Sequence, residues 1–387
     1  MLTRIDQVLS RHRVVITVGA GGVGKTTLAA AVGLEEALSG RRVMVVTIDP
    51  ARRLATALGL SDIGGQPRSV DISSLGGQGQ GGMDIMMLDP RQVFTDMITR
   101  NTQDPQRVSR VLENPFFKLF ARAMGGTQEH AAVEQLLQLL EAGRYDLIVL
   151  DTPPSRHALD FLTSPTRLMN WLDDTVLKWV AAPAGGSLTL FSFGSRYIGK
   201  VISHFTGGES LADVATFISL AAEDFRYLRT RAVKVHQVLH QDDTLYLVVG
   251  SPERHGLEGA LMFERALKKD GFQVGAYVLN RVETAPDRMA TAALLDGLSQ
   301  GESAGLIDDL TTLLSRHERQ AKAHEAKVAE LVEAVKGHRP VFVVPAYRQE
   351  IVTIHSVRDV ARRLFAAPAR YAQPQGGDIP PPPEDHP

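Results

Sequence analysis

The chain has 387 residues, a formal net charge of −2 and no cysteine, with 42 Lys and Arg residues against 44 Asp and Glu. This balance argues against a dedicated nucleic-acid binder, which usually carries a basic excess, and the absence of cysteine excludes disulfides and thiolate metal sites. Hydrophobic residues make up 44% of the chain, enough to fill a sizeable core.

The N-terminal segment, MLTRIDQVLSRHRVV, contains no apolar stretch typical of a signal peptide. No apolar run along the chain approaches the roughly 18 residues that a membrane-spanning helix needs. We therefore expect a cytoplasmic protein without stable membrane insertion.

Short apolar runs recur along the chain, bounded by turn residues and separated by helical patterns. Runs rich in Val, Ile and Leu without strict alternation are typical of strands buried on both faces. Their alternation with helices predicts an α/β fold with a doubly wound, mostly parallel sheet. The predicted strands are Val14–Val18, Val43–Ile48, Asp84–Leu88, Leu147–Leu150, Leu245–Val249, Ala276–Leu279 and Val341–Val344.

A glycine-rich motif follows the first predicted strand. Residues 19–26 read GAGGVGKT, which fits the phosphate-loop pattern G-x-x-x-x-G-K-[ST], and a helical segment follows directly. Glycines let backbone N–H groups turn onto phosphate oxygens, and the start of a helix favours anions. Lys25 is expected to reach the β- and γ-phosphates, and the Thr26 hydroxyl to ligate magnesium. The predicted nucleotide-binding residues here are Gly19, Gly21, Gly22, Val23, Gly24, Lys25, Thr26 and Thr27.

Two further strands end in aspartate: Asp49 follows the second strand and Asp151 the fourth. Ligands of an open parallel sheet bind beyond the carboxyl ends of its strands, so both carboxylates are expected near the phosphate loop. An apolar strand that ends in Asp is the Walker B pattern, which assigns Asp151 to magnesium, directly or through water. Asp49 is then predicted to orient the attacking water. Taken alone, either aspartate is explained equally well as a helix cap or turn residue.

Two stretches interrupt the alternation of strands and helices. They contain helical spacing without a convincing strand, which predicts a helical subdomain of 91–135 and 163–240. The P-loop ATPase core is then discontinuous, formed by 1–90, 136–162 and 241–367.

Three other segments have distinct compositions. Residues 73–82, SSLGGQGQGG, are predicted to form a flexible loop, and a long polar helix is expected from about Leu306 to Val335. The Pro-rich tail, residues 368–387, is predicted to be disordered.

Four segments, in chain order, resemble the ArsA family of ATPases, which includes arsenical-pump and tail-anchored-protein-targeting members. They are GAGGVGKTT (19–27), TIDPARRLATAL (47–58), MLDPRQVF (87–94) and EAGRYDLIVLDTPPSRHALDFL (141–162). Two later segments, YVLNRV (277–282) and VVPAYRQEI (343–351), resemble the family's adenine-binding segments. The resemblance implies ATP and Mg²⁺ as cofactors and a dimer as the working unit.

The resemblance also implies roles for single residues. It makes Asp49 the water-positioning residue of switch I and places Asp151 to His157 in switch II. It assigns adenine contacts to Asn280 and to the segment with Pro345. His157 is more simply explained as a structural hydrogen-bonding residue than as a catalytic one.

The phosphate loop departs from the family at Ala20, where relatives carry a lysine that crosses the dimer interface. We hypothesise that a switch-segment arginine, Arg52, Arg53 or Arg156, replaces that cation; Arg52 and Arg156 are the predicted catalytic arginines beside Lys25. The alternative is a heterodimer in which a paralogous partner chain supplies the lysine.

The lack of cysteine is a second departure. The zinc site that holds targeting dimers and the thiolates that bind arsenite in pump members have no counterpart here. His236 and His240 have the i, i+4 spacing of a metal-binding pair. Without a third ligand, a solvated histidine pair is the simpler interpretation.

The leading functional hypothesis is a dimeric ATPase that captures or targets a hydrophobic segment of a client or membrane protein through its helical subdomain. One alternative is an ATP-binding regulatory half of a heterodimer, favoured by Ala20. Another is a positioning ATPase of the ParA and MinD kind, which the acidic Pro-rich tail disfavours.

Overall fold

The computed structural model describes residues 3–48, 52–61, 63–77, 81–101, 127–152, 229–287, 304–335, 339–347 and 349–370, with a few single positions between them. The predicted site residues Asp49, Arg156 and His157 lie outside this set, as do most of the predicted helical subdomain and residues 371–387.

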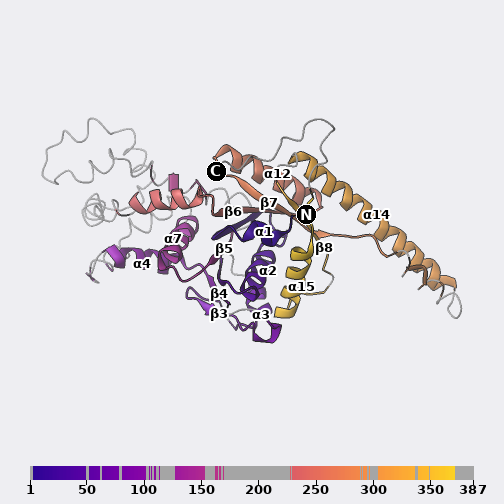
Figure 1. Cartoon of the computed structure of the whole chain (residues 1–387), viewed down its shortest axis with the longest axis horizontal. Helices are drawn as coiled ribbons and strands as arrows, with labels where there is room; N and C mark the ends of the chain where they lie inside the picture. The colour runs from indigo at the N-terminus through magenta and orange to yellow at the C-terminus, as the bar shows by residue number, and fades with distance from the viewer. Residues whose placement is uncertain are drawn as a thin grey trace, which may run out of the picture.

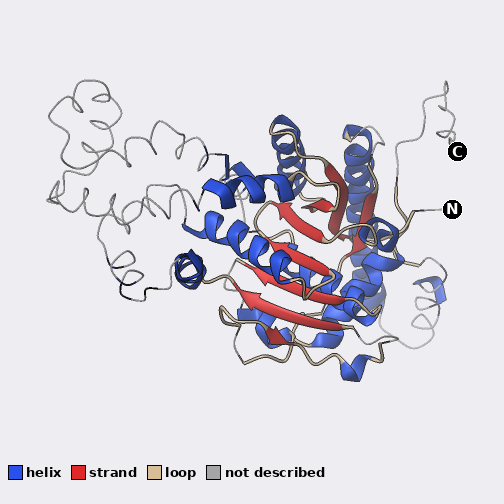
Figure 2. Ribbon diagram, turned by 60° about the vertical axis from the view of Figure 1, so that its left-hand side comes forward, coloured by secondary structure: helices blue, strands red, loops and turns tan. Residues whose placement is uncertain are grey.

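Eight strands form one sheet in the described part of the chain (Figure 2). They are β1 (Val14–Gly19), β2 (Arg42–Thr47), β3 (Arg68–Ser69), β4 (Gly82–Met87), β5 (Leu147–Asp151), β6 (Thr244–Gly250), β7 (Val274–Val282) and β8 (Val341–Pro345). Their order is β3-β4-β2-β5-β1-β6-β7-β8. All pairs are parallel except β3 with β4, which is antiparallel. The predicted α/β fold with a mostly parallel sheet is therefore confirmed.

Each predicted apolar run coincides with a strand, with bounds that differ by three residues at most. Strand β3 was not predicted, because its two residues are both exposed and carry no apolar signal. The predicted loop 73–82 differs from the structure at both ends. Ser73–Leu75 is a 3₁₀ helix with Leu75 buried, and β4 already begins at Gly82.

Helices cover both faces of the sheet (Figure 1). On one face pack α1 (Ile5–Leu9), α2 (Lys25–Leu38), α3 (Arg52–Ala57) and α15 (Ile354–Ala366). On the other lie α7 (Thr127–Ala142), α12 (Arg254–Lys269), α14 (Ala304–Ala334) and a helix over residues 229–239. A further helix, α4 (Pro90–Asn101), contacts α7.

The two faces use alternate residues of the same strands. In β1, Val15 packs toward α2, whereas Val14 and Ile16 pack toward α7 and α12. Both sets are buried, which is why the strand sequences are continuously apolar rather than alternating.

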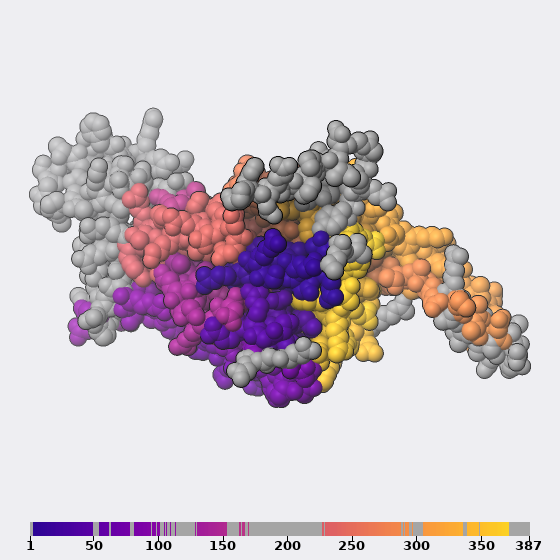
Figure 3. Space-filling view, viewed as in Figure 1, coloured from indigo at the N-terminus to yellow at the C-terminus, as the bar shows by residue number. Residues whose placement is uncertain are grey.

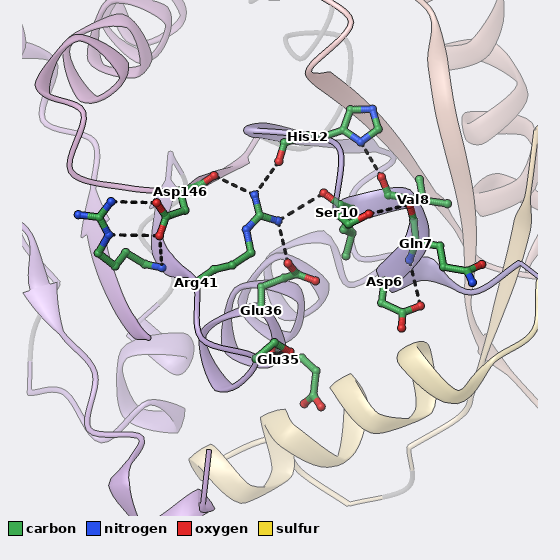
Figure 4. Close-up of polar contacts among 12 residues, drawn as sticks. Asp6, Gln7, Val8, Ser10, His12, Glu35, Glu36, Arg41 and Asp146 are labelled. Atoms are coloured by element: carbon green, nitrogen blue, oxygen red, sulfur yellow. Dashed lines mark hydrogen bonds and ion pairs between the residues drawn. The ribbon is translucent and has the colours of Figure 1, made fainter. Parts of the chain in front are cut away.

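At the amino ends of the strands, Arg41 joins three segments of the chain (Figure 4). Its guanidinium donates to the Glu36 carboxylate at 2.8 Å and to the carbonyl oxygens of Leu9, His12 and Asp146 at 3.3, 2.7 and 2.8 Å. The Glu36 side chain is only 7% exposed, so Arg41 compensates a buried carboxylate while it fixes the N-terminal helix to the sheet.

A second buried ion cluster joins α7 to the helix over residues 229–239. Arg231 donates to both carboxylate oxygens of Glu134 at 3.0 and 2.7 Å and to Glu141 at 2.6 Å. The two helices lead directly into β5 and β6, the strands that flank β1. We call this pair of helices the stem.

Candidate functional site: the loop between β1 and α2

The loop from β1 to α2 is tightly constrained by its surroundings. Gly22 and Gly24 have positive φ angles of 78° and 95°, a backbone conformation that residues other than glycine rarely adopt. A Cβ atom on Gly24 would lie 2.4 Å from Nδ2 of Asn280, and one on Gly19 would lie 2.1 Å from the Val249 carbonyl oxygen. The glycines are thus required both by backbone conformation and by close packing.

Lys25 begins α2 and is almost buried, with 6% of its surface exposed. Its Nζ donates to the carbonyl oxygens of Gly19 at 3.1 Å and Ala20 at 2.9 Å. The ammonium group therefore lies across the loop, where the backbone N–H groups at the start of α2 favour an anion.

Asp151, at the end of β5, is fully buried and accepts hydrogen bonds from three hydroxyl groups. Thr26 of α2 donates to Oδ2 at 2.6 Å, Thr47 of β2 donates to Oδ2 at 3.1 Å, and Thr17 of β1 donates to Oδ1 at 3.4 Å. Thr152 continues the network by donating to the Thr17 carbonyl oxygen at 2.6 Å. The carboxylate therefore connects three adjacent strands to the first turn of α2.

Sequence reasoning singled out Thr26 and Asp151 but missed Thr17 and Thr47. Thr17 carries a signal, because it is a polar residue inside the otherwise apolar, fully buried strand β1. Thr47 is the buried last residue of β2, after the apolar run Val43–Val46. A carboxylate and a hydroxyl 2.6 Å apart are hard oxygen ligands of the kind that Mg²⁺ prefers. The chemistry of this pair therefore fits the predicted ion.

Asn280 reaches the loop from β7. Its Nδ2 donates to the Val23 carbonyl oxygen at 2.8 Å, and the residue is 8% exposed. The pairing of β7 with β8 shifts register between Leu279 and Val282, and Arg281 has a positive φ of 61°. This irregularity lies where the Asn280 side chain bonds the loop.

A pocket of about 530 Å³ opens beside this site, where β7 and β8 end. Pro345, which is predicted to contact adenine, lines it together with the acidic residues Glu283, Asp287 and Asp359. Arg363 lies over the Tyr347 ring, with its Cζ atom 5.1 Å from the ring centre. The pocket thus has one aromatic wall and several hydrogen-bonding groups.

The other predicted cations are only partly placed. Arg52 and Arg53 lie in α3, but the structure does not describe their side chains. Arg156, like the predicted water-positioning residue Asp49, lies outside the described residues. Ala20 faces α12, since a Cβ atom on Gly259 would lie 2.9 Å from the Ala20 Cβ. The small residues at 20 and 259 therefore allow α12 to approach the phosphate loop closely.

His236 and His240 lie side by side at the surface, with His240 exposed and His236 partly buried. The rings stack with centres 4.2 Å apart, and His240 also stacks on Phe272 at 4.3 Å. Burial, and then the charge of His240, lower the pKa of His236.

In the part of the chain that the structure covers, no group of three His, Asp or Glu residues is arranged to hold a metal. The described helices also include none long and apolar enough to cross a bilayer.

Comparison with known proteins finds relatives across much of the chain. A family profile described as anion-transporting ATPase, ArsA_ATPase, matches residues 12–294 of 387. A Halobacterium salinarum protein assigned as an arsenical pump-driving ATPase is 30% identical over 186 residues, 43% of this chain. An Aquifex aeolicus protein assigned as arsenical pump-driving ATPase 1 is 21% identical over 369 residues, 91% of this chain.

The ATPase GET3 of Kluyveromyces lactis is 27% identical over 253 residues, 60% of this chain. The shared part is 70% of the GET3 protein and 78% of the Aquifex protein, but only 26% of the Halobacterium protein. The chain therefore spans about a quarter of the length of that archaeal relative.

Proposed function

This chain is an ATPase of the anion-transporting, or ArsA, family, and from that premise we propose that it is a dimeric switch driven by ATP. In this proposal, hydrolysis at the loop between β1 and α2 changes the position of the stem. The stem carries that change to the predicted helical subdomain, which holds a hydrophobic segment of a client protein.

The observation that carries the proposal is the contact between Thr26 and Asp151. Their 2.6 Å hydrogen bond brings the predicted Walker B carboxylate to the first turn of the helix that follows the phosphate loop. Asp151 ends the same strand into which α7 of the stem leads. In this proposal Asp151 therefore serves both the nucleotide site and the connection toward the predicted helical subdomain.

Each residue of the site has a proposed role in hydrolysis. Backbone N–H groups of the glycine loop bind phosphate oxygens, and Lys25 moves from its loop carbonyls to the β- and γ-phosphates. Thr26 and Asp151 would hold magnesium. A bound magnesium ion supplies charge neutralisation for the transferred phosphoryl group. Asp49 orients the water that attacks the γ-phosphorus, and the bond from that phosphorus to the β,γ-bridging oxygen breaks to release ADP.

The adenine is proposed to lie in the pocket at the ends of β7 and β8. Pro345 and Tyr347 offer an apolar and an aromatic surface there, and Asn280 lies next to the phosphate loop. One of the two Nδ2 hydrogens of Asn280 is donated to Val23, so an adenine contact would use the other hydrogen or the amide oxygen.

Residue 20 supports a second candidate function, that of one half of a heterodimer. Ala20 lies against Gly259 of α12 and offers no cation to a partner chain. Arg52 or Arg156 is proposed to supply that charge. If neither does, the chain is the ATP-binding half of a heterodimer whose other half supplies a lysine.

The test is magnesium-dependent ATP hydrolysis by the purified chain over a wide range of protein concentrations, with Asp49→Asn as control. A homodimeric switch predicts turnover per chain that rises with concentration and is lost in the variant. Tight ATP binding without turnover would favour the heterodimer, and absence of ATP binding would refute the proposal.

Client capture needs a separate measurement. Apolar helical peptides should change the fluorescence of Trp171 and Trp179, which lie in the predicted helical subdomain, and the change should differ between ATP and ADP. A panel of membrane-anchor peptides that gives no nucleotide-dependent response would refute this part.

A further inference from the structure

Residues 283–287, which follow β7 directly, form one wall of the proposed adenine pocket. All five of them line the pocket, and none belongs to a helix or strand. Thr284 and Ala285 are exposed. A segment with few buried contacts opens readily unless neighbouring groups hold it in place. We call residues 283–287 the pocket loop.

Two histidines of α14 bind the first residue of the pocket loop. Nε2 of His317 donates to the Glu283 carboxylate at 2.9 Å, and the Glu283 backbone N–H donates to Nδ1 of His324 at 3.0 Å. The histidines are seven residues apart, so they lie on the same side of the helix, about 10 Å apart along its axis. Glu283 is therefore held through both its side chain and its backbone.

The two rings make opposite kinds of hydrogen bond. A backbone N–H can only donate, so Nδ1 of His324 accepts and the proton of this neutral ring is on Nε2. The Glu283 carboxylate accepts, so His317 contributes a donor. Each ring can therefore be replaced by a different amide: Asn places an oxygen near the position of Nδ1, and Gln places a nitrogen near the position of Nε2.

Helix α14 gives these bonds a fixed support. Its N-terminal half projects beyond the sheet, whereas its C-terminal half is packed on the body of the molecule (Figures 1 and 3). Ala321 and Val328 are buried, and together with His317 and His324 they recur at intervals of three and four residues. This spacing places all four on one side of the helix. Both rings therefore belong to the side by which α14 packs.

The opposite wall of the pocket is held by other groups. Arg363 of α15 donates to the Ala346 carbonyl oxygen at 3.2 Å and also covers the Tyr347 ring. The Ala346 backbone N–H donates to the Val282 carbonyl oxygen at 3.0 Å. Replacing the histidines of α14 should therefore disturb the pocket loop and leave the wall with Pro345 and Tyr347 in place.

We propose that His317 and His324 are positioning residues for the base of the nucleotide. The proposal rests on the adenine pocket proposed above and names residues that set the affinity of that pocket. Among the described residues, His317 lines the pocket and His324 does not, so His324 acts through Glu283. When either bond is lost, fewer chains have a pocket loop that accepts the base, and the observed dissociation constant rises by the same factor.

The test is binding of Mg²⁺-ADP and of Mg²⁺-pyrophosphate to the full chain, measured by isothermal titration calorimetry. Pyrophosphate has the two phosphates of ADP and no base, so it reports on the phosphate loop alone. His317→Leu and His324→Leu should each raise the dissociation constant for ADP about three- to tenfold, the effect of one lost hydrogen bond. The dissociation constant for pyrophosphate should stay unchanged.

Conservative variants separate positioning from simple packing. His324→Asn keeps an acceptor and His317→Gln keeps a donor, so both should bind ADP like the wild type. His324→Gln moves its amide one carbon further out and should weaken ADP binding, which keeps the test open if a leucine variant does not fold. Lys322→Leu makes a leucine on the far, exposed side of α14 and is the matched control with no expected effect.

Three results would overturn the positioning role. They are leucine variants that bind ADP like the wild type, leucine variants that lose ADP and pyrophosphate affinity equally, and Asn and Gln variants as weak as the leucine ones. A wild-type chain that binds ADP no more tightly than pyrophosphate also overturns it, because the base then gains nothing from the pocket. A wild-type chain that binds neither ligand refutes the proposed function itself.

Discussion

A carboxylate is buried at each end of the central strands, but the groups that donate hydrogen bonds to it differ between the two ends. At the carboxyl end, Asp151 accepts hydrogen bonds from the neutral hydroxyls of Thr17, Thr26 and Thr47. At the amino end, Glu36 is paired with the guanidinium of Arg41 (Figure 4). Asp151 and Thr26 together offer hard oxygen ligands of the kind that Mg²⁺ prefers, whereas the Glu36 carboxylate is ion-paired within the chain.

Asp151 and Glu36 are both buried, so burial alone does not identify a functional carboxylate. The partner residues differ between the two ends: the carboxyl end, with three hydroxyl donors on Asp151, is the one proposed to bind magnesium, and the amino end, with Arg41, holds the N-terminal helix in place. The contrast predicts that substitutions at the carboxyl end lower activity, and that substitutions at the amino end lower stability.

The largest expected effect is at Asp151. Asp151→Asn keeps the size of the side chain but removes the charge that is proposed to hold magnesium, so turnover should fall roughly 10²- to 10³-fold. Asp146→Asn makes the same change just before the amino end of the same strand and should leave turnover unchanged. Steady-state ATP hydrolysis of both variants is the measurement. Equal losses in the two variants would contradict the contrast between the ends.

The next effect is at Arg41. Arg41→Met leaves the buried Glu36 carboxylate uncompensated and removes donors to three carbonyl groups, so the free energy of unfolding should fall by about 3 kcal/mol. Arg42→Met is the control, because the Arg42 side chain is 57% exposed in its pair with Asp146, so its loss should leave the free energy of unfolding nearly unchanged. Urea unfolding measures both changes. Similar losses in the two variants would show that the buried cluster has no special role.

The smallest effect is the pH dependence contributed by Glu36. Burial raises the pKa of Glu36, although Arg41 acts in the opposite direction. The folded chain therefore binds this proton more tightly than the unfolded chain does. The resulting stabilisation is complete below the unfolded pKa, near 4.5, and is lost as the pH rises through the raised value.

Glu36→Gln removes this titration. Unfolding free energies of the wild type and the variant, measured from pH 4 to 7, should therefore diverge as the pH rises, with the wild type losing stability relative to the variant. Parallel curves would mean that Arg41 fully offsets the cost of burying Glu36.

The sequence was sufficient to predict the parallel sheet and the glycine-rich loop between its first strand and the helix that follows. The strands are apolar on both faces, and the glycine pattern of residues 19–26 is a local signal. The partners of Asp151 were not predictable in the same way. Thr17 and Thr47 approach it only because β5 lies between β1 and β2, an order that no local pattern encodes.

Other features depend on tertiary contacts and were missed for the same reason. Arg41 bonds backbone carbonyls as distant in sequence as Asp146, and backbone acceptors leave no trace in residue identity. The irregular pairing at Arg281 and the short strand β3 are set by neighbouring strands rather than by their own residues.

The ion cluster of Arg231 has a mechanical consequence for the stem. Because Arg231 holds both Glu134 and Glu141, the helices that enter β5 and β6 cannot slide past one another without breaking buried charge pairs. Both helices also pack their apolar sides on the same face of the sheet, against the strands around β1. The stem is therefore one rigid, doubly anchored base, and any displacement of β5 or β6 would have to be shared by both of its helices.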